Sequence, residues 1–348
     1  MKKINFTAPA RPQINYPIIV EQGALDKLPT LIENLHDVDR IIVLYDKALE
    51  SIANRIAELF SEAALIAVPS GEESKLLLQV ERIIQDMLIK KASRRSVLIN
   101  VGGGVLTDIG GFIASVYMRG IRFIHVPTSL LCMTDAAIGG TTAINVGPVK
   151  NMIGTVYHPE AVVIDTDVLA GLPDEMLRDG MVEVVKMAAI LDAEFFGWLE
   201  ENIERVINRE EEALNISIQN AARMKTEAMA KGDLDDEVRL YLNFGHTVGH
   251  AVETLSKLTI SHGKAVSIGM VCEMKMAGSA DSERIIRLLE ELGMPLDIPL
   301  TMKTDQLWDI MLNDKKTVGG DVRIAIPDTI ASGSVRSINK TEFTDACK

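Results

Sequence analysis

Residues 97–108 read VLINVGGGVLTD, and the fold that we expect follows from this segment. The apolar run 97–101 is typical of a buried strand, and Gly102, Gly103 and Gly104 end it. A glycine-rich turn between a strand and a helix lets backbone N–H groups approach a phosphate closely. The turn is neither G-x-G-x-x-G nor a P-loop, because no Gly-Lys-Ser/Thr follows. Taken alone, it indicates either a nucleotide site or a tight turn without a ligand.

Strand and helix patterns continue on both sides of this turn. Further buried strands are predicted at 40–45 (RIIVLY), 121–126 (IRFIHV) and 161–165 (AVVID), with a helix at 76–91 between them. After about residue 172 the patterns are helical, at 174–200, 202–231, 245–257, 262–278 and 282–292, and a hairpin is predicted from 322–327 and 332–338. We therefore expect an α/β domain with a parallel sheet over 1–172 and a mostly α-helical domain over 173–348.

The composition excludes several classes of protein. The 348 residues include 36 Lys and Arg against 49 Asp and Glu, a net charge of −13. That charge argues against non-specific nucleic-acid binding and against an anionic membrane surface. No run of 18 apolar residues occurs, the N-terminus has no apolar signal-peptide core, and the three cysteines lack metal-type spacing. We expect a cytoplasmic protein with reduced thiols and no membrane partner.

Three of the six histidines fall close together, at His246, His250 and His262. His246 and His250 are four residues apart, so they share a helix face and could ligate zinc, with a third ligand still to be found. They could equally be a pair of capping or core histidines. Glu183 and Lys186 also share a helix face, and their neighbours are apolar. They are either a surface ion pair or a zinc ligand beside a substrate-binding lysine.

Several cations stand beside glycines, asparagines or apolar segments. In a chain of charge −13, a pocket that gathers such cations would suit a small anionic substrate. Taken singly, each cation could be an ordinary solvated surface residue. The set is Arg119, Lys150, Lys225, Arg239, Lys315 and Lys316.

These motifs occur together, and in this order, in one family. Over nearly its whole length the chain resembles the 3-dehydroquinate synthases of the sugar-phosphate cyclase superfamily. The resemblance is carried by PSGEESK (69–75), GGGVLTDIGGF (102–112), YMRG (117–120), VPTSLL (126–131), KNMIG (150–154), VEVVK (182–186), RLYLNFGHTVGHAVE (239–253), HGKAVSIGM (262–270) and DKK (314–316).

The resemblance implies an NAD-binding domain, a metal-binding domain and an active site in the cleft between them. It implies that zinc or cobalt is held by Glu183, His246 and His262, so that His250 contacts the substrate phosphate or transfers a proton. It implies a homodimer in which Arg119 reaches the neighbouring site. The NAD contacts implied are Asp46, Glu72, Lys75, Gly103, Gly104, Val105, Asp108, Thr128, Ser129 and Lys150. The substrate contacts implied are Asp135, Lys150, Asn151, Lys186, Lys225, Arg239, Asn243, His250 and Lys315.

The chemistry implied by the resemblance converts 3-deoxy-D-arabino-heptulosonate 7-phosphate into 3-dehydroquinate and phosphate. NAD⁺ transiently oxidises the C5 hydroxyl while the metal polarises its oxygen. The new ketone acidifies the adjacent C–H, and phosphate leaves by β-elimination. Reduction at C5, ring opening and an intramolecular aldol step follow. NAD is regenerated in each turnover, so the enzyme expected is a lyase of the shikimate pathway.

One departure from the family pattern keeps further functions open. The family usually reads Gly-Gly-Lys-Thr where this chain has Gly139–Gly140–Thr141–Thr142, so Thr141 replaces a lysine expected at the substrate phosphate. Related cyclases such as 2-deoxy-scyllo-inosose synthase vary in this loop, whereas Arg239 and Lys225 match the carboxylate-binding pair of dehydroquinate synthases. A polyol or glycerol-phosphate dehydrogenase, or a catalytically inactive homologue acting as a binding protein, would also be compatible with parts of the pattern.

Overall fold

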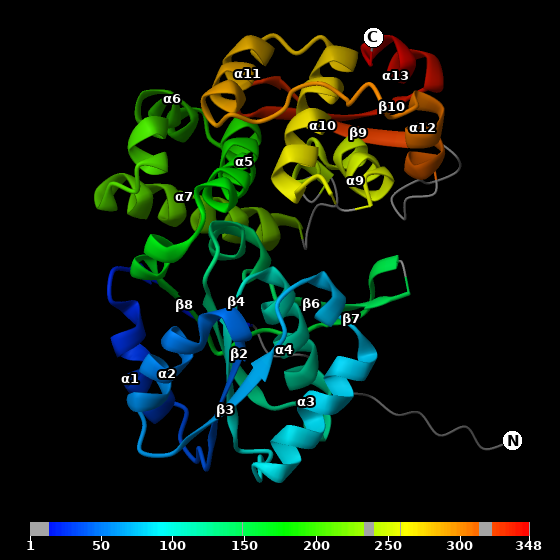
Figure 1. The fold of residues 1–348 in the computed structure, drawn as a ribbon. Coiled ribbons are helices and arrows are strands. Elements are labelled where there is room, and N and C mark those ends of the chain that lie inside the picture. The colour runs from blue at the N-terminus through cyan, green and yellow to red at the C-terminus, as the bar shows by residue number, and fades with distance from the viewer. Residues whose placement is uncertain (1–13, 148, 233–239, 258, 313–321, 348) are drawn as a thin grey trace, which may run out of the picture.

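The computed structural model describes residues 14–147, 149–232, 240–257, 259–312 and 322–347. The N-terminal part, coloured blue to cyan-green in Figure 1, is built around a sheet, and the green-to-red part beyond it is mostly helical. Arg239 and Lys315 lie outside the described residues. Among the described residues, no helix combines the length and apolarity that crossing a bilayer requires.

The sheet of the N-terminal part has six parallel strands in the order β1-β8-β5-β4-β2-β3. The four strands predicted from the sequence are confirmed, and they are the four central ones. The two edge strands were not predicted: β1 has only four residues, all of them partly buried, and β3 is rich in alanine and only partly buried. The strands are β1 (Ile18–Glu21), β2 (Ile41–Asp46), β3 (Ala63–Val68), β4 (Val97–Gly102), β5 (Arg122–Pro127) and β8 (Ala161–Asp165).

Helices cover both faces of this sheet, because successive side chains of a buried strand point to opposite faces. Ile42 and Leu44 of β2 belong to the apolar cluster under α3 and α4, whereas Val43 belongs to the cluster under α1 and α2. A small antiparallel sheet of β6 (Thr141–Val146) and β7 (Val149–Val156) packs against α4. The helices and short turns are η1 (Ala24–Lys27), α1 (Leu28–Glu33), η2 (Lys47–Leu49), α2 (Glu50–Glu58), η3 (Glu72–Ser74), α3 (Leu77–Ile89), α4 (Gly104–Val116), η4 (Tyr117–Arg119), η5 (Cys132–Ala136) and η6 (Thr166–Gly171).

The C-terminal part is helical, with one antiparallel hairpin of β9 (Val322–Thr329) and β10 (Ser332–Ile338), as predicted. The prediction of a single helix over 174–200 is wrong. The backbone of Asp192 is extended (φ −150°), and its side chain accepts a hydrogen bond from Phe195 N at 3.0 Å, so a new helix starts there. The helices are α5 (Asp174–Leu191), α6 (Ala193–Ile207), α7 (Glu211–Gly232), α9 (His246–Leu255), α10 (His262–Ala277), α11 (Ser282–Glu291), α12 (Thr304–Leu312) and α13 (Lys340–Ala346).

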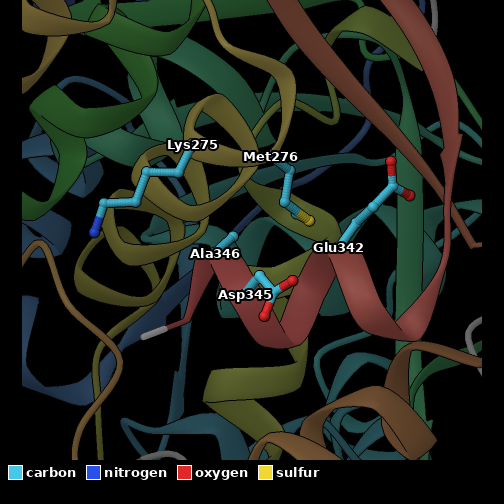
Figure 2. A pocket seen from close by; sticks show the side chains of 5 residues that line it. All are labelled: Lys275, Met276, Glu342, Asp345 and Ala346. Atoms are coloured by element: carbon cyan, nitrogen blue, oxygen red, sulfur yellow. The ribbon is translucent and has the colours of Figure 1, made fainter.

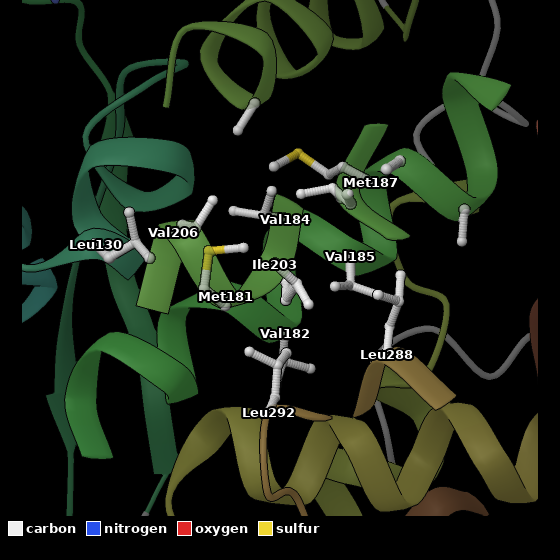
Figure 3. Packing of buried hydrophobic residues seen from close by; sticks show 14 of the residues in the cluster. Leu130, Met181, Val182, Val184, Val185, Met187, Ile203, Val206, Leu288 and Leu292 are labelled. Atoms are coloured by element: carbon white, nitrogen blue, oxygen red, sulfur yellow. The ribbon is translucent and has the colours of Figure 1, made fainter. Parts of the chain in front are cut away.

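Helix α5 is the core of the helical part. Its residues from Gly180 to Ile190 are all buried, and they pack against α6, α7, α10 and α11. Figure 3 shows Met181, Val182 and Val185 of α5 among apolar side chains of neighbouring segments. A helix that is apolar all round must be enclosed on every side. Any polar side chain of α5 between Gly180 and Ile190 is therefore held in an apolar interior, which makes its partners informative.

Candidate active site

Two charged side chains lie inside this apolar helix. Glu183 and Lys186 are one turn apart on α5, and both are buried. The Lys186 ammonium contacts Glu183 Oε2 directly. The other carboxylate oxygen, Oε1, is buried and has no hydrogen-bond partner among the described residues. A buried carboxylate oxygen without a hydrogen bond is costly, so this atom indicates a place for a cation.

Two imidazoles face this orphaned oxygen. His246 is the first residue of α9 and His262 is the first residue of α10. Their Nε2 atoms lie 3.5 Å and 3.4 Å from Glu183 Oε1. The three ligand atoms lie within 4.8 Å of one another. One carboxylate and two imidazoles leave an open position on Zn²⁺ or Co²⁺, so these residues fit the metal expected from the sequence.

The charge states of Glu183 and His246 suit ligands, whereas His262 holds a proton when no metal is bound. Burial opposes ionisation of Glu183, but Lys186, His246 and His262 outweigh it and hold its pKa well below its ordinary value. Burial, together with the charge of Lys186, lowers the pKa of His246 well below its ordinary value, so its imidazole is neutral. Burial also opposes the charge on His262, but Glu183 and Glu253 outweigh burial and raise its pKa to about 10. His262 must release this proton before its imidazole can bind a metal, so metal binding at this site is expected to release a proton.

Glu253 belongs to the site although the sequence reasoning missed it. Its Oε2 lies 3.5 Å from His262 Nδ1, and its Oε1 accepts a hydrogen bond from Lys150 Nζ at 2.8 Å. A carboxylate behind a histidine ligand fixes the orientation of the ring. Glu253 lies one turn after His250 on α9, and that spacing is the signal that could have found it. The His250 ring lies beside both ligand histidines, with centroids 5.2 Å from His246 and 6.1 Å from His262.

The expected cofactor residues gather at one edge of the sheet. β2 pairs with β3 on one side and β4 on the other, so the strand order reverses between β2 and β4. Open α/β sheets bind ligands beyond the strand ends at such a point. Asp46 ends β2, the triple glycine follows β4, and Thr128 and Ser129 follow β5. These strand ends converge because parallel strands finish at the same edge.

The glycine turn fits a phosphate. No side chain caps α4, which leaves the N–H groups of Gly104 and Val105 as donors for an anion. Gly103 has no side chain to cover these N–H groups, although a Cβ there would meet Ser129 Oγ at an ordinary van der Waals distance of 3.4 Å. The turn and the helix end therefore fit the pyrophosphate of the NAD expected from the sequence.

A polar network continues from this turn. Lys75 Nζ lies 2.5 Å from Asp108 Oδ2 and 2.6 Å from Asn151 Oδ1. Burial raises the pKa of Asp108 to about 6, although Lys75 opposes the shift. Asn145, which the sequence reasoning missed, accepts from Asn151 N at 2.9 Å and donates to Glu72 Oε1 at 2.7 Å. The network thus ties four predicted residues, Glu72, Lys75, Asp108 and Asn151, into one group.

The expected substrate residues lie where the two parts of the chain meet. Lys225 of α7 contacts Asp135 of η5 at 2.5 Å, and Lys150 of β7 contacts Glu253 of α9. Asn243 lies in the turn before α9, where its carbonyl accepts from His246 N at 2.9 Å. Arg119 is exposed in η4 and, among the described residues, contacts no other predicted site residue. The roles of all these residues stay predictions.

A pocket of about 560 Å³ elsewhere on the surface is not this site. It lies between the end of α10 and α13, and Lys275, Met276, Glu342, Asp345 and Ala346 line it (Figure 2). Met276 is fourteen residues after His262 on α10, which at 1.5 Å per residue is roughly 20 Å away along the helix. The side chains that line this pocket, all of them within the described ranges, form no cluster of metal ligands.

Comparisons with known proteins agree with the geometry. Residues 65–179 match the family model of the 3-dehydroquinate synthase N-terminal region, and residues 180–317 match that of the C-terminal region. A 3-dehydroquinate synthase from Desulforamulus reducens is 36% identical over 328 residues, which cover 91% of each chain.

Two solved structures are similar over almost the whole chain. The 2-epi-5-epi-valiolone synthase of Streptomyces hygroscopicus, with NAD⁺ and Zn²⁺ bound, has a TM-score of 0.88 and 26% identity, and the match covers 98% of each chain. A 2-deoxy-scyllo-inosose synthase in complex with carbaglucose-6-phosphate, NAD⁺ and Co²⁺ has a TM-score of 0.84 and 25% identity over 95% of each chain. The family models, the curated relative and the fold lead to one conclusion: this chain belongs to the 3-dehydroquinate synthase family.

Proposed function

We propose that the protein is a 3-dehydroquinate synthase, which converts 3-deoxy-D-arabino-heptulosonate 7-phosphate into 3-dehydroquinate and phosphate. The observation that carries this proposal is the orphaned Glu183 Oε1, which faces His246 and His262 inside an apolar helix bundle. This chemistry requires a cation with an open coordination position and a lysine close to it. Lys186 meets the second requirement, because it contacts the carboxylate of Glu183. The 36% identity to a curated 3-dehydroquinate synthase supports the same activity.

Two groups from outside the chain supply part of the chemistry. A divalent cation held by Glu183, His246 and His262 would polarise the C5 oxygen of the substrate. NAD held at the edge of the sheet would supply reversible oxidation at C5. We assign residues 1–172 to NAD binding and residues 173–348 to metal and substrate binding. The start of α5 directly after Pro173 supports a boundary at this point.

The side chains of the protein bind and orient the substrate. Lys150, Lys186 and Lys225 offset the negative charges of a sugar phosphate that also carries a carboxylate. Each lysine has a carboxylate partner in this structure, so the pocket is charge-balanced before an anion binds. We assign proton transfer at the C5 hydroxyl oxygen to His250, which lies beside both ligand histidines. Arg239 and Lys315 complete the assigned substrate contacts.

Phosphate release tests this proposal. Purified protein with NAD and Zn²⁺ or Co²⁺ is expected to release stoichiometric phosphate from the heptulosonate phosphate and to form 3-dehydroquinate. Omission of NAD, and the variant Glu183→Ala, control for contaminating phosphatases. Accumulation of NADH with a polyol and no phosphate would establish a dehydrogenase instead. Saturable substrate binding without turnover by metal- and NAD-loaded protein would establish the inactive binding protein.

One observation favours a second candidate, a related cyclase with a different sugar phosphate. Thr141 begins β6 and is exposed, so no charge stands where the family carries lysine. Hydroxyl groups donate one hydrogen bond but no charge. Phosphate release from a hexose phosphate, without release from the heptulosonate phosphate, would establish this second candidate.

We also propose a cytoplasmic homodimer in which Arg119 completes the site of the partner subunit. Arg119 is exposed at positive φ (71°), and β7 is exposed along most of its length. Mixing the inactive variants Arg119→Ala and Lys186→Met tests this proposal. If Arg119 acts on the partner's site, mixed dimers contain one intact site and activity returns. If it acts within its own subunit, mixing restores nothing.

A further inference from the structure

Both histidines of the candidate metal centre occupy the same unusual position. Each is the first residue of its helix, His246 of α9 and His262 of α10. The first turn of a helix has backbone N–H groups without intrahelical partners, and it usually frays unless a side chain caps it. Neither helix is capped by the side chain of its own preceding residue. The caps come from carboxylates on other helices.

Glu273 of α10 caps the start of α9. Its Oε2 accepts a hydrogen bond from Gly245 N at 2.8 Å, and its Oε1 accepts one from Val248 N at 3.2 Å. The two bonded N–H groups flank His246 in the sequence. Glu273 is completely buried, and a buried carboxylate requires such donors. The bond pair therefore fixes the backbone on both sides of His246.

Asp179 of α5 caps the start of α10 in the same way. Its Oδ1 accepts hydrogen bonds from Lys264 N, at 3.1 Å, and from the hydroxyl of Ser261. These two residues flank His262 closely. Asp179 lies four residues before Glu183, so one turn of α5 carries both the cap and the third ligand. The position of His262 is thus tied directly to that of Glu183.

Glycines make this arrangement possible. A Cβ at Gly263 would lie 2.2 Å from the Asp179 carbonyl oxygen, and a Cβ at Gly269 would lie 1.9 Å from the Gly245 carbonyl oxygen. Such distances are impossible for a real side chain, so the backbone of α10 must touch both α5 and the start of α9. Backbone contact brings the capping carboxylates within reach of the helix ends.

The caps also change the local electrostatics. The N-terminal end of a helix carries about half a positive charge, so it attracts anions and repels cations. α9 and α10 both begin beside the expected divalent cation, since their first residues, His246 and His262, are two of its expected ligands. The carboxylates of Glu273 and Asp179 lie on the N–H groups that carry this positive charge and offset it. Without them, the two helix ends would oppose the metal.

We propose that Glu273 and Asp179 are positioning residues of the metal centre. They hold the first turns of α9 and α10 so that His246 and His262 converge on Glu183, and they offset the positive helix ends beside the cation. This proposal rests on the metal site of the proposed function. It goes beyond that function because neither residue is a ligand or a predicted substrate contact.

Cobalt binding to the full-length protein tests the proposal. The affinity of Co²⁺ alone is measured by competition with a chromophoric chelator, and its coordination by visible absorption. Glu273→Gln replaces one of two accepting oxygens by a donor, so it loses one of its two capping bonds. Asp179→Asn can keep both bonds on Oδ1 but removes the negative charge that offsets the helix end. Each is expected to weaken Co²⁺ binding about 10- to 100-fold, the usual cost of losing a residue that supports a ligand. The absorption spectrum is expected to change as well, because the ligands shift.

Asp165 provides a matched control. It is also completely buried and caps backbone groups, accepting from Gly23 N at 2.9 Å and Leu25 N at 3.2 Å, but it ends β8 of the sheet. Asp165→Asn is expected to lower stability while leaving the Co²⁺ affinity unchanged. The positioning role is refuted if Glu273→Gln and Asp179→Asn lower the affinity no more than Asp165→Asn.

Three further outcomes have a defined meaning. If Glu273→Gln fails to fold, the half-buried Asp179 still decides the matter through Asp179→Asn. If the unaltered protein binds no Co²⁺, the metal centre of the proposed function is wrong. If it binds Co²⁺ and both variants bind equally tightly, only the positioning role is wrong.

Discussion

Replacing Lys186 by methionine isolates the energy of the buried charge pair on α5. The side chains of Lys186 and Glu183 are 3% and 1% exposed. Methionine retains the apolar volume but leaves the carboxylate without its ammonium partner. Removing one member of a buried pair typically costs about 3–5 kcal/mol, because the remaining charge stays desolvated. Metal-free Lys186→Met protein is therefore expected to lose about that much unfolding free energy.

The matched control is Lys264→Met. Lys264 of α10 pairs with Glu175, which is also on α5, but their side chains are 32% and 68% exposed. Exposed pairs contribute about 0–1 kcal/mol. Urea unfolding in the presence of a chelator measures both variants, and tryptophan fluorescence reports on the helical part because Trp198 and Trp308 lie in α6 and α12.

Added metal is expected to reduce the loss of unfolding free energy caused by Lys186→Met. A divalent cation at Glu183 Oε1 takes over the role of the lost ammonium, so the stability deficit of Lys186→Met shrinks when Zn²⁺ or Co²⁺ is added. By linkage, each 1.4 kcal/mol of shrinkage corresponds to about tenfold tighter metal binding by the variant. The reasoning is refuted if Lys186→Met loses no more than Lys264→Met, or if metal leaves its deficit unchanged.

Three further predictions concern other parts of the molecule. Glu183→Ala is expected to lose bound zinc, measured as metal per chain after gel filtration, whereas the exposed control Glu175→Ala keeps it; one retained equivalent in Glu183→Ala would contradict the ligand assignment. Thr141→Lys is expected to lower KM for the heptulosonate phosphate about tenfold at similar kcat, since a charged hydrogen bond contributes about 1–3 kcal/mol; an unchanged KM counts against the loop position. Burial opposes ionisation of Asp192, but hydrogen bonds from the α6 backbone and Arg223 outweigh it and lower its pKa below 3.8. Its stabilisation is therefore complete well above pH 3.8 and is lost progressively as the pH falls through the lowered pKa of the folded state. Asp192→Ala should therefore cost about 1–2 kcal/mol of unfolding free energy at pH 7 and less at pH 3; an equal cost at both would contradict the shift.

Local sequence patterns predicted the strands and helices whose formation depends mainly on their own residues. The four central strands are mostly apolar runs that end at glycine, proline or aspartate, and the structure contains all four. The edge strands β1 and β3 escaped prediction because β1 is very short and β3 is rich in alanine, so neither has the length and composition of the central strands. The break at Asp192 escaped it because apolar periodicity continues across a cap that a single extended residue creates.

In the candidate site, too, some features were predicted from the sequence and others are determined by the tertiary structure. Residue types and spacing marked Glu183, His246 and His262, and family resemblance assigned their roles. Their convergence within 4.8 Å is a property of the tertiary structure, because more than sixty residues separate Glu183 from His246. Glu253 was missed although its spacing from His250 placed it on the same face of α9, and the packing of α9 against α10 is what brings it to His262.

Residue types and their order were enough to predict an acidic, two-part chain with a strand, a glycine turn and a helix for a phosphate, followed by helices that carry ligand-type residues. How those residues are held depends on the packing of the folded chain. Glu273 and Asp179 look like ordinary helix carboxylates in the sequence, and they become caps only because glycines let three helix backbones touch. Periodicity records which face of an element is apolar, whereas the partner of a buried charge depends on which elements pack together.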